Sequence, residues 1–112
     1  MLARSSRLHR RAEFRTATRQ GRRVSAPGLV VHAHLEPAAG GPRVGFVVGR
    51  PVGPAVTRNL VRRRLQHLVA ERLDQLPPGT RLVVRATPAA AGRTFAALGE
   101  ALDAALAKAY AR

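Results

Sequence analysis

The chain has 112 residues, no cysteine and a formal net charge of +14 at pH 7. This length fits a single domain over residues 1–112 with one modest core, and the lack of cysteine excludes disulfides and thiolate metal sites. No apolar run is long enough to cross a bilayer, and the basic N-terminus lacks the apolar core of a secretory signal. We therefore expect a cytoplasmic protein.

The positive charge is concentrated in the first part of the chain. Of the 20 Lys and Arg residues, 14 lie in residues 1–64, together with only two of the six acids. A compact domain this basic repels itself, and the usual partner that relieves the repulsion is a polyanion. Nucleic acid is the first candidate. A membrane surface is a weaker one, because the arginines of the most basic segment are bunched at one end and do not follow one helix face.

The elements of the first half are expected to be an arm, a helix and two strands. Residues 1–10 are basic and unpatterned, which predicts a flexible arm. Residues 11–22 favour a short helix, and residues 22–27 read as a loop. Residues 28–36 and 43–50 are typical of strands, and the turn-forming segment between them predicts a hairpin.

The second half is expected to hold two helices and a strand. A Pro/Gly-rich loop leads into a helix that runs to about residue 75, residues 80–87 favour a strand, and residues 93–112 favour a helix with Phe95 on its buried stripe. The order α-β-β-α-β-α predicts an α/β chain, built as a two-layer α+β sandwich with a small sheet covered by helices.

The helix that starts near residue 57 combines a buried stripe with a basic end. At 100° per residue, Val61, Leu65 and Leu68 share one side, and Leu60 falls on the exposed side. Arginine binds phosphate through two parallel hydrogen bonds, and the positive end of a helix favours anions. We therefore predict that the first two turns bind nucleic-acid phosphates. The candidate residues are Arg58, Asn59, Arg62, Arg63 and Arg64.

The stretch RVGFVVGRPVGPAVTRNLVRRRLQHL, with RLHRRAEFRTATRQGRR before it and LVVRATPAAA after it, resembles the protein subunit of bacterial ribonuclease P over nearly the whole chain. The family signature is an Arg-Asn-Arg triplet at the start of the central helix. Here it reads Arg58-Asn59-Leu60, so the third position departs from the pattern. The resemblance implies an RNA-binding subunit of a ribonucleoprotein that removes the 5′ leader of precursor tRNA. It also implies a left-handed β-α-β crossover.

The resemblance further implies two RNA-binding surfaces. The basic helix would contact the catalytic RNA subunit, and a cleft between the first helix and the sheet would bind the single-stranded leader. The cleft positions are Phe14, Val30, His32 and Arg50, with supporting basic residues at Arg11, Arg22 and Arg23. His32 stands where many members have Tyr, and Thr18 stands where many have a second Phe. The resemblance implies Mg²⁺ held mainly by the RNA subunit, and none on the protein alone.

Two alternatives stay open. The six acids are scattered, so we expect a chain without catalytic groups of its own. His32 and His34 share one face of a strand, however, and paired imidazoles could act as acid and base in a protein-only nuclease. A generic basic RNA-binding protein of ribosome-associated type would share the charge and the helix but would not need the leader cleft.

Overall fold

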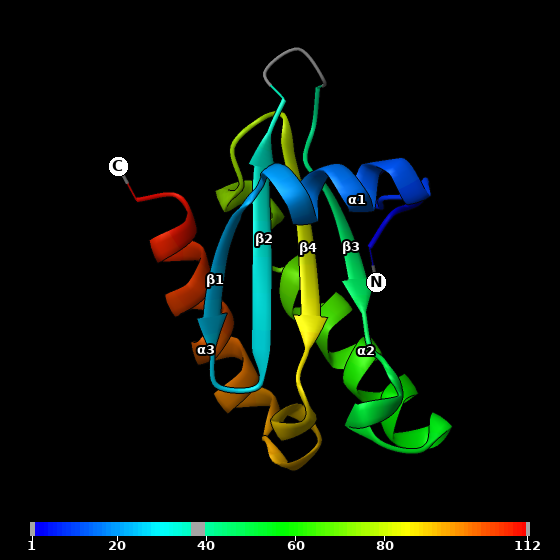
Figure 1. Cartoon of the computed structure of the whole chain (residues 1–112). Coiled ribbons are helices and arrows are strands. Elements are labelled where there is room, and N and C mark those ends of the chain that lie inside the picture. The colour runs from blue at the N-terminus through cyan, green and yellow to red at the C-terminus, as the bar shows by residue number, and fades with distance from the viewer. Residues whose placement is uncertain (1, 37–39, 112) are drawn as a thin grey trace.

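The computed structural model describes residues 2–36 and 40–111, and within them it shows one four-stranded sheet covered by helices on both faces (Figure 1). Helices α2 and α3 cover one face, and α1 crosses the other. The predicted class is confirmed, with one additional strand. The elements are α1 (Arg11–Gln20), β1 (Arg22–Ala26), β2 (Leu29–Leu35), β3 (Arg43–Val47), η2 (Arg50–Val52), α2 (Ala55–Ala70), β4 (Thr80–Ala86), η4 (Pro88–Gly92) and α3 (Phe95–Ala109), with short 3₁₀ turns η1 (Arg4–Ser6) and η3 (Leu73–Gln75).

The strands lie in the order β1-β2-β4-β3. Strand β4 pairs antiparallel with β2 and parallel with β3, so it separates the two strands that the sequence joins in a hairpin. The predicted hairpin is therefore wrong, and residues 37–39 of its turn lie outside the described residues. The central place of β4 fits the apolar run Leu82, Val83 and Val84, all three fully buried, because a strand covered on both faces carries apolar residues in succession.

The connection from β3 through α2 to β4 is left-handed. Seen from the side of α1, β3 lies to the right of β4, both strands run downward, and α2 lies behind the sheet (Figure 1). Such crossovers are right-handed in nearly all proteins. The handedness implied by the family resemblance is thus confirmed.

Residues 22–26 form the edge strand β1, so the loop predicted there is wrong. Val24 pairs with Val31 in the middle of the β1–β2 ladder. The turn between the two strands uses Gly28 with φ of 94°, a backbone conformation that residues with a side chain rarely adopt. The strand escaped prediction because only one β-branched residue, Val24, stands in a basic and polar segment.

The main core lies between the sheet and the α2–α3 layer. Val61, Leu65, Leu68 and Val69 of α2 are all at most 2% exposed, which confirms the predicted stripe. Phe95 was expected on the buried stripe of α3 but is 40% exposed, so that expectation is wrong. None of the helices in the described part of the chain is long and apolar enough to cross a membrane.

The N-terminal segment follows the edge of the sheet and does not extend as a free arm. Leu2 and Leu8 are 2% and 6% exposed, and Arg7 forms a parallel bridge with Val44 of β3. The two leucines give this basic segment apolar anchors. The expected arm over residues 1–10 is therefore corrected for residues 2–10, and Met1 lies outside the described residues.

Candidate functional site

Two rows of side chains cross the sheet face that carries α1. The strand register aligns them, and the alternation of side chains places them on the face opposite the α2–α3 layer. Val30 and His32 share this face, as the alternation predicts. The first row is Arg23, His32, Val83 and Gly45; the second is Ser25, Val30, Arg85 and Val47.

Helix α1 lies on this face through Phe14 and Ala17. Ala17 is fully buried and forms a small apolar cluster with Leu8 and Val83, and the half-buried Phe14 packs against the same cluster. Phe14 lies directly over Gly45, because a Cβ atom on that glycine would collide with the Phe14 ring. The absence of a side chain at Gly45 therefore lets an aromatic ring lie close to the sheet.

Glu13 links α1 to strands β3 and β4 through ion pairs. Its carboxylate accepts a hydrogen bond from the backbone N–H of Arg10 at 3.2 Å, which helps cap the helix. It also lies 3.7 Å from Arg43 Nη1 and 3.9 Å from Arg81 Nε. Arg81 is only 6% exposed and donates a further hydrogen bond to the carbonyl of Gly41. Glu13, the acidic residue of α1, therefore forms contacts within the fold. It does not neutralise the arginines on the outer surface of the helix.

The outer surface of α1 carries arginines four residues apart. Arg11, Arg15 and Arg19 are all exposed, and residues four apart lie on the same side of a helix. Arg11 was predicted as a supporting residue, whereas Arg15 and Arg19 were missed although their spacing was visible in the sequence. Thr18 does not replace the second ring of the family pattern, since its hydroxyl donates to the Phe14 carbonyl at 2.9 Å.

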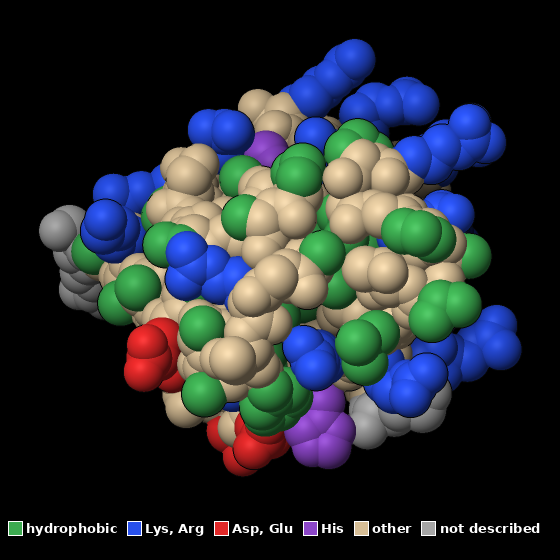
Figure 2. All heavy atoms as spheres, turned by 90° about the horizontal axis from the view of Figure 1, so that it is seen from below, with side chains coloured by type: hydrophobic (Ala, Val, Ile, Leu, Met, Phe, Trp, Pro, Cys, Tyr) green, Lys and Arg blue, Asp and Glu red, His purple; other side chains and the backbone are tan. Residues whose placement is uncertain are grey.

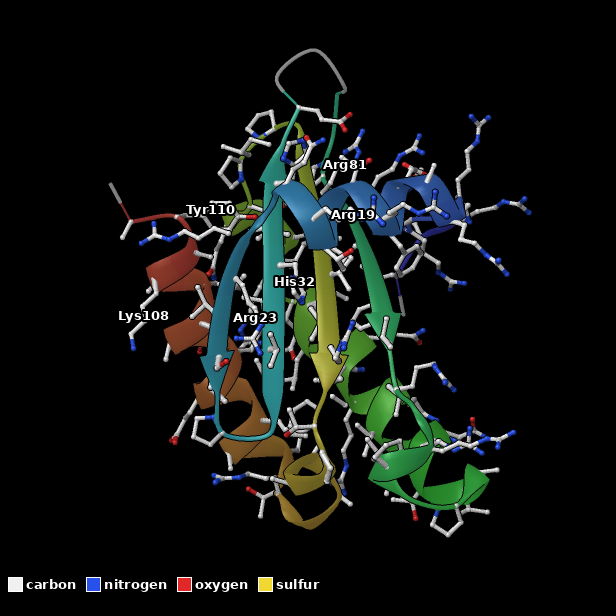
Figure 3. The ribbon with its side chains drawn as sticks, in the orientation of Figure 1. Arg19, Arg23, His32, Arg81, Lys108 and Tyr110 are labelled. Atoms are coloured by element: carbon white, nitrogen blue, oxygen red, sulfur yellow. The ribbon has the colours of Figure 1, made fainter. Side chains whose placement is uncertain are left out.

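His32 lies buried beside Arg23 in the first row (Figure 3). It is 8% exposed, and among the described residues no group forms a hydrogen bond with its Nδ1 atom. Burial lowers the pKa of His32, and the positive charges of Arg85 and Arg23 lower it further. The imidazole is therefore neutral at neutral pH, and its Nδ1 atom is buried without a hydrogen-bond partner among the described residues.

Arg85 joins the site although it was not among the sequence candidates. It is exposed on the second row, beside Val30 in the register of β2 and β4. Alternation along residues 80–87 places Arg81, Val83 and Arg85 on one face. Only the sheet order shows that this is the face under α1, which is why the residue was missed.

The two arginines of β1 point to opposite faces. Arg23 lies in the first row beside His32. Arg22 lies on the side of α3, where its Nη1 atom donates to the carbonyl of Ala111 at 2.9 Å. The structure thus brings Arg23 to the predicted cleft and directs Arg22 away from it.

An open hollow of about 270 Å³ continues the second row toward α2. Its lining includes Val47, Arg85 and Pro51. Arg50, the predicted cleft residue next to Pro51, is exposed in the turn η2. This hollow connects the α1 face to the loop that leads into the basic helix.

The first three turns of α2 present guanidinium groups that donate hydrogen bonds to neighbouring acceptors. Arg58 Nε donates to the Gly53 carbonyl at 3.1 Å, and Arg64 Nη1 donates to the Arg93 carbonyl at 3.2 Å. Arg62 Nη1 donates to Asn59 Oδ1 at 3.0 Å. Each guanidinium carries five N–H donors, so these contacts orient the groups without exhausting them.

The surface of this end of the molecule is strongly basic. No acidic residue lies in the first turn of α2, and Arg63 is exposed. Figure 2 shows Lys and Arg side chains mainly around the rim of this end, hydrophobic and other groups across its centre, and acidic side chains gathered at one edge. Leu60 is 42% exposed, which confirms its predicted position and interrupts the basic surface with an apolar group.

A comparison with protein families decides the assignment. The family model described as Ribonuclease P matches residues 2–110. The chain belongs to the ribonuclease P protein family. Ribonuclease P protein components from Streptomyces griseus and Salinispora tropica are 51% and 46% identical to it, covering 95% and 99% of this chain and 93% and 95% of their own lengths.

Solved structures of ribonuclease P proteins share the fold. The protein from Staphylococcus aureus superposes with a TM-score of 0.84 at 22% identity, over 94% of this chain and 95% of that one. The protein from Thermotoga maritima superposes with a TM-score of 0.79 at 24% identity, over 91% and 96%. These two structures show the shared fold, and the family match together with the sequence relatives makes the chain a protein component of ribonuclease P, an endoribonuclease.

The described residues do not offer a metal site of the chain's own. Among residues 2–36 and 40–111, no three or more His, Asp or Glu side chains gather in a way that could hold a metal ion. The carboxylate of Glu13 faces Arg43 and Arg81, and that of Asp103 accepts from Arg72 at 2.6 Å.

Proposed function

We propose that this ribonuclease P protein binds the catalytic RNA through the start of α2 and the single-stranded 5′ leader of precursor tRNA across the α1 face. The observation that carries the proposal is the α1 face itself, where Phe14 and the neutral His32 lie among exposed arginines on a surface that leads toward α2. The cytoplasm, where precursor tRNA is made, is the proposed compartment.

The start of α2 supports the contact with folded RNA. Arg58, Asn59, Arg62, Arg63 and Arg64 occupy two helical turns without an acid in the first turn. Contacts of this kind neutralise phosphates and release counterions, so they give strong, salt-dependent binding. A folded RNA presents closely spaced backbone phosphates, which suits an array of guanidinium groups fixed on a rigid helix.

The α1 face supports the contact with an unpaired strand. Single-stranded nucleic acid binds where aromatic or apolar surface lies within a basic groove, because bases stack on the rings while phosphates meet the charges. Here the half-buried Phe14 provides apolar surface, Val30 adds a small part of it at 7% exposed, and Arg23, Arg85 and Arg50 provide charge. His32 adds a buried nitrogen without a partner among the described residues, which a base edge would reach once neighbouring side chains shift.

In this proposal the protein positions the substrate and the RNA subunit performs the cleavage with Mg²⁺. Holding the leader on the α1 face while α2 holds the catalytic RNA fixes the scissile phosphate relative to that RNA. Positioning of this kind turns a bimolecular encounter into an intramolecular one. The positive charge of the protein also reduces the repulsion between two polyanions, which lowers the Mg²⁺ concentration that assembly needs.

A leader-dependence experiment tests the proposal. The holoenzyme should bind precursor tRNA more tightly than mature tRNA, and Phe14→Leu should reduce that preference by about 5-fold or more, because one base–ring stack stabilises by about 1–3 kcal/mol. Leucine keeps apolar contact with the sheet and removes the ring. Leu35→Ala, an exposed apolar residue at the end of β2, is the control. Equal losses for precursor and mature tRNA would contradict a leader-binding role.

A further inference from the structure

An aromatic and basic hollow lies at the junction of α2 and the start of α3. It has a volume of about 250 Å³ and is lined by Arg63, Arg64, His67 and Phe95. The ring of Phe95 is 40% exposed and meets the edge of the His67 ring, with centroids 5.9 Å apart and planes at 68°. The surface thus combines two rings with two guanidinium groups.

Core packing does not account for the position of Phe95. Leu98, one turn later on α3, is fully buried, whereas Phe95 stands at the helix start with its ring against α2. Among the described residues the exposed large hydrophobic side chains are Leu35, Val56, Leu60 and Phe95, of which only Phe95 is aromatic. An exposed ring next to arginines is the arrangement on which unpaired bases stack.

Basic residues lie on one side of Phe95 and mainly acidic residues on the other. On one side lie Arg63 and Arg64, and Arg64 is held in place by the carbonyl of Arg93. On the other side a separate hollow is lined by Glu71, Glu100 and Asp103, together with Arg72, which is paired with Asp103. A phosphate is favoured only on the first side, so a bound strand would lie in one defined position across the ring.

We propose that this hollow binds one unpaired base of the catalytic RNA, stacked on Phe95 beside His67, with the adjoining phosphates at Arg63 and Arg64. The inference rests on the proposed function and deepens it. Two observations identify the catalytic RNA as the occupant: the hollow follows directly on the segment of α2 that carries Arg58 and Arg62, and its arginines complement a phosphate backbone.

The test measures binding of the cognate catalytic RNA to the full-length protein over a range of salt concentrations. Phe95→Ala should weaken binding by about tenfold at every salt concentration and leave the salt slope unchanged, because it removes a stack and no phosphate contact. Phe95→Leu should weaken binding comparably, and Phe95→Tyr should bind like the unaltered protein. Leu35→Ala, which removes an exposed apolar side chain elsewhere, should have no effect.

The outcomes separate this inference from the proposed function. If the unaltered protein fails to bind the catalytic RNA, the proposed function is overturned. If it binds and Phe95→Ala binds equally well, or if Phe95→Leu restores full affinity, the stacking inference alone is overturned. A second arm measures precursor tRNA binding by the holoenzyme: a loss seen only there would assign the base to the precursor and overturn the assignment to the catalytic RNA.

Discussion

The imidazole of His32 lies between the charges of Arg23 and Arg85 on the floor of the α1 face. Burial and both arginines act in the same direction and lower the pKa of His32. A neutral ring avoids adding a third positive charge to this part of the sheet. Its Nδ1 atom has no hydrogen-bond partner among the described residues and is shielded from solvent, so a base edge in the proposed leader contact would reach it only after neighbouring side chains shift.

The lowered pKa predicts a loss of stability in acid. Because the folded state binds the His32 proton less tightly than the unfolded state, the free energy of unfolding should fall as pH drops below the unfolded pKa of about 6.5 and level off below the folded pKa. Denaturant unfolding at a series of pH values, compared with His32→Asn, measures this contribution. NMR titration of the imidazole should show its pKa rising in Arg85→Ala; an unchanged pKa would contradict the charge effect.

Gly45 provides a second test at the scale of one residue. An added methyl group would collide with the Phe14 ring, so Gly45→Ala should destabilise the fold by about 1–3 kcal/mol, as overpacking does, or displace α1. Denaturant unfolding measures the change. Gly41→Ala is the matched control, since a Cβ atom at Gly41 meets nothing within 4 Å. Equal stability of the two variants would show that Phe14 does not lie over the sheet as described.

Helix α2 is the element that joins fold and function, because its buried stripe fixes the direction of its arginines. Arg58→Ala combined with Arg62→Ala should weaken binding of the catalytic RNA and reduce the salt slope by roughly two units, about one for each lost phosphate contact. Arg22→Ala combined with Lys108→Ala removes the same charge near α3 and should change the slope far less. Identical slopes for the two double variants would mean that binding depends on net charge alone.

The amphipathic stripe of α2 was predictable because Val61, Leu65 and Leu68 recur at helical spacing. The edge strand β1 was not, since its residues are basic or polar and only pairing with β2 orders them. The sheet order was missed for a similar reason. Short loops favour hairpins, and nothing local in residues 28–50 shows that β4, far along the chain, inserts between β2 and β3.

The candidate site was predictable only in part. Phe14, Val30 and His32 follow from alternation and family resemblance, and the structure brings them to one face. Arg85 reaches that face through the long-range pairing of β2 with β4, which no local pattern reveals. Phe95 was assigned to the core because it fits the helical stripe, yet its place in the first turn of α3 lets it turn toward His67.

At the scale of the whole molecule, the residues that make up the net charge of +14 are unevenly placed on the surface. Arginines line the outer side of α1 and the start of α2, whereas acids such as Glu13 and Asp103 are paired with arginines that join elements together. The protein therefore presents two basic surfaces connected through the turn η2. This arrangement suits a subunit that holds two RNAs at once.

The most direct test of this account is cleavage of precursor tRNA by the cognate catalytic RNA at low Mg²⁺ concentration, with and without the protein. We predict that the protein strongly stimulates removal of the 5′ leader and that the protein alone cleaves nothing. Cleavage by the protein without RNA would contradict the proposal that it carries no catalytic group. Tight binding to the catalytic RNA without any stimulation would contradict the proposed role in positioning the leader.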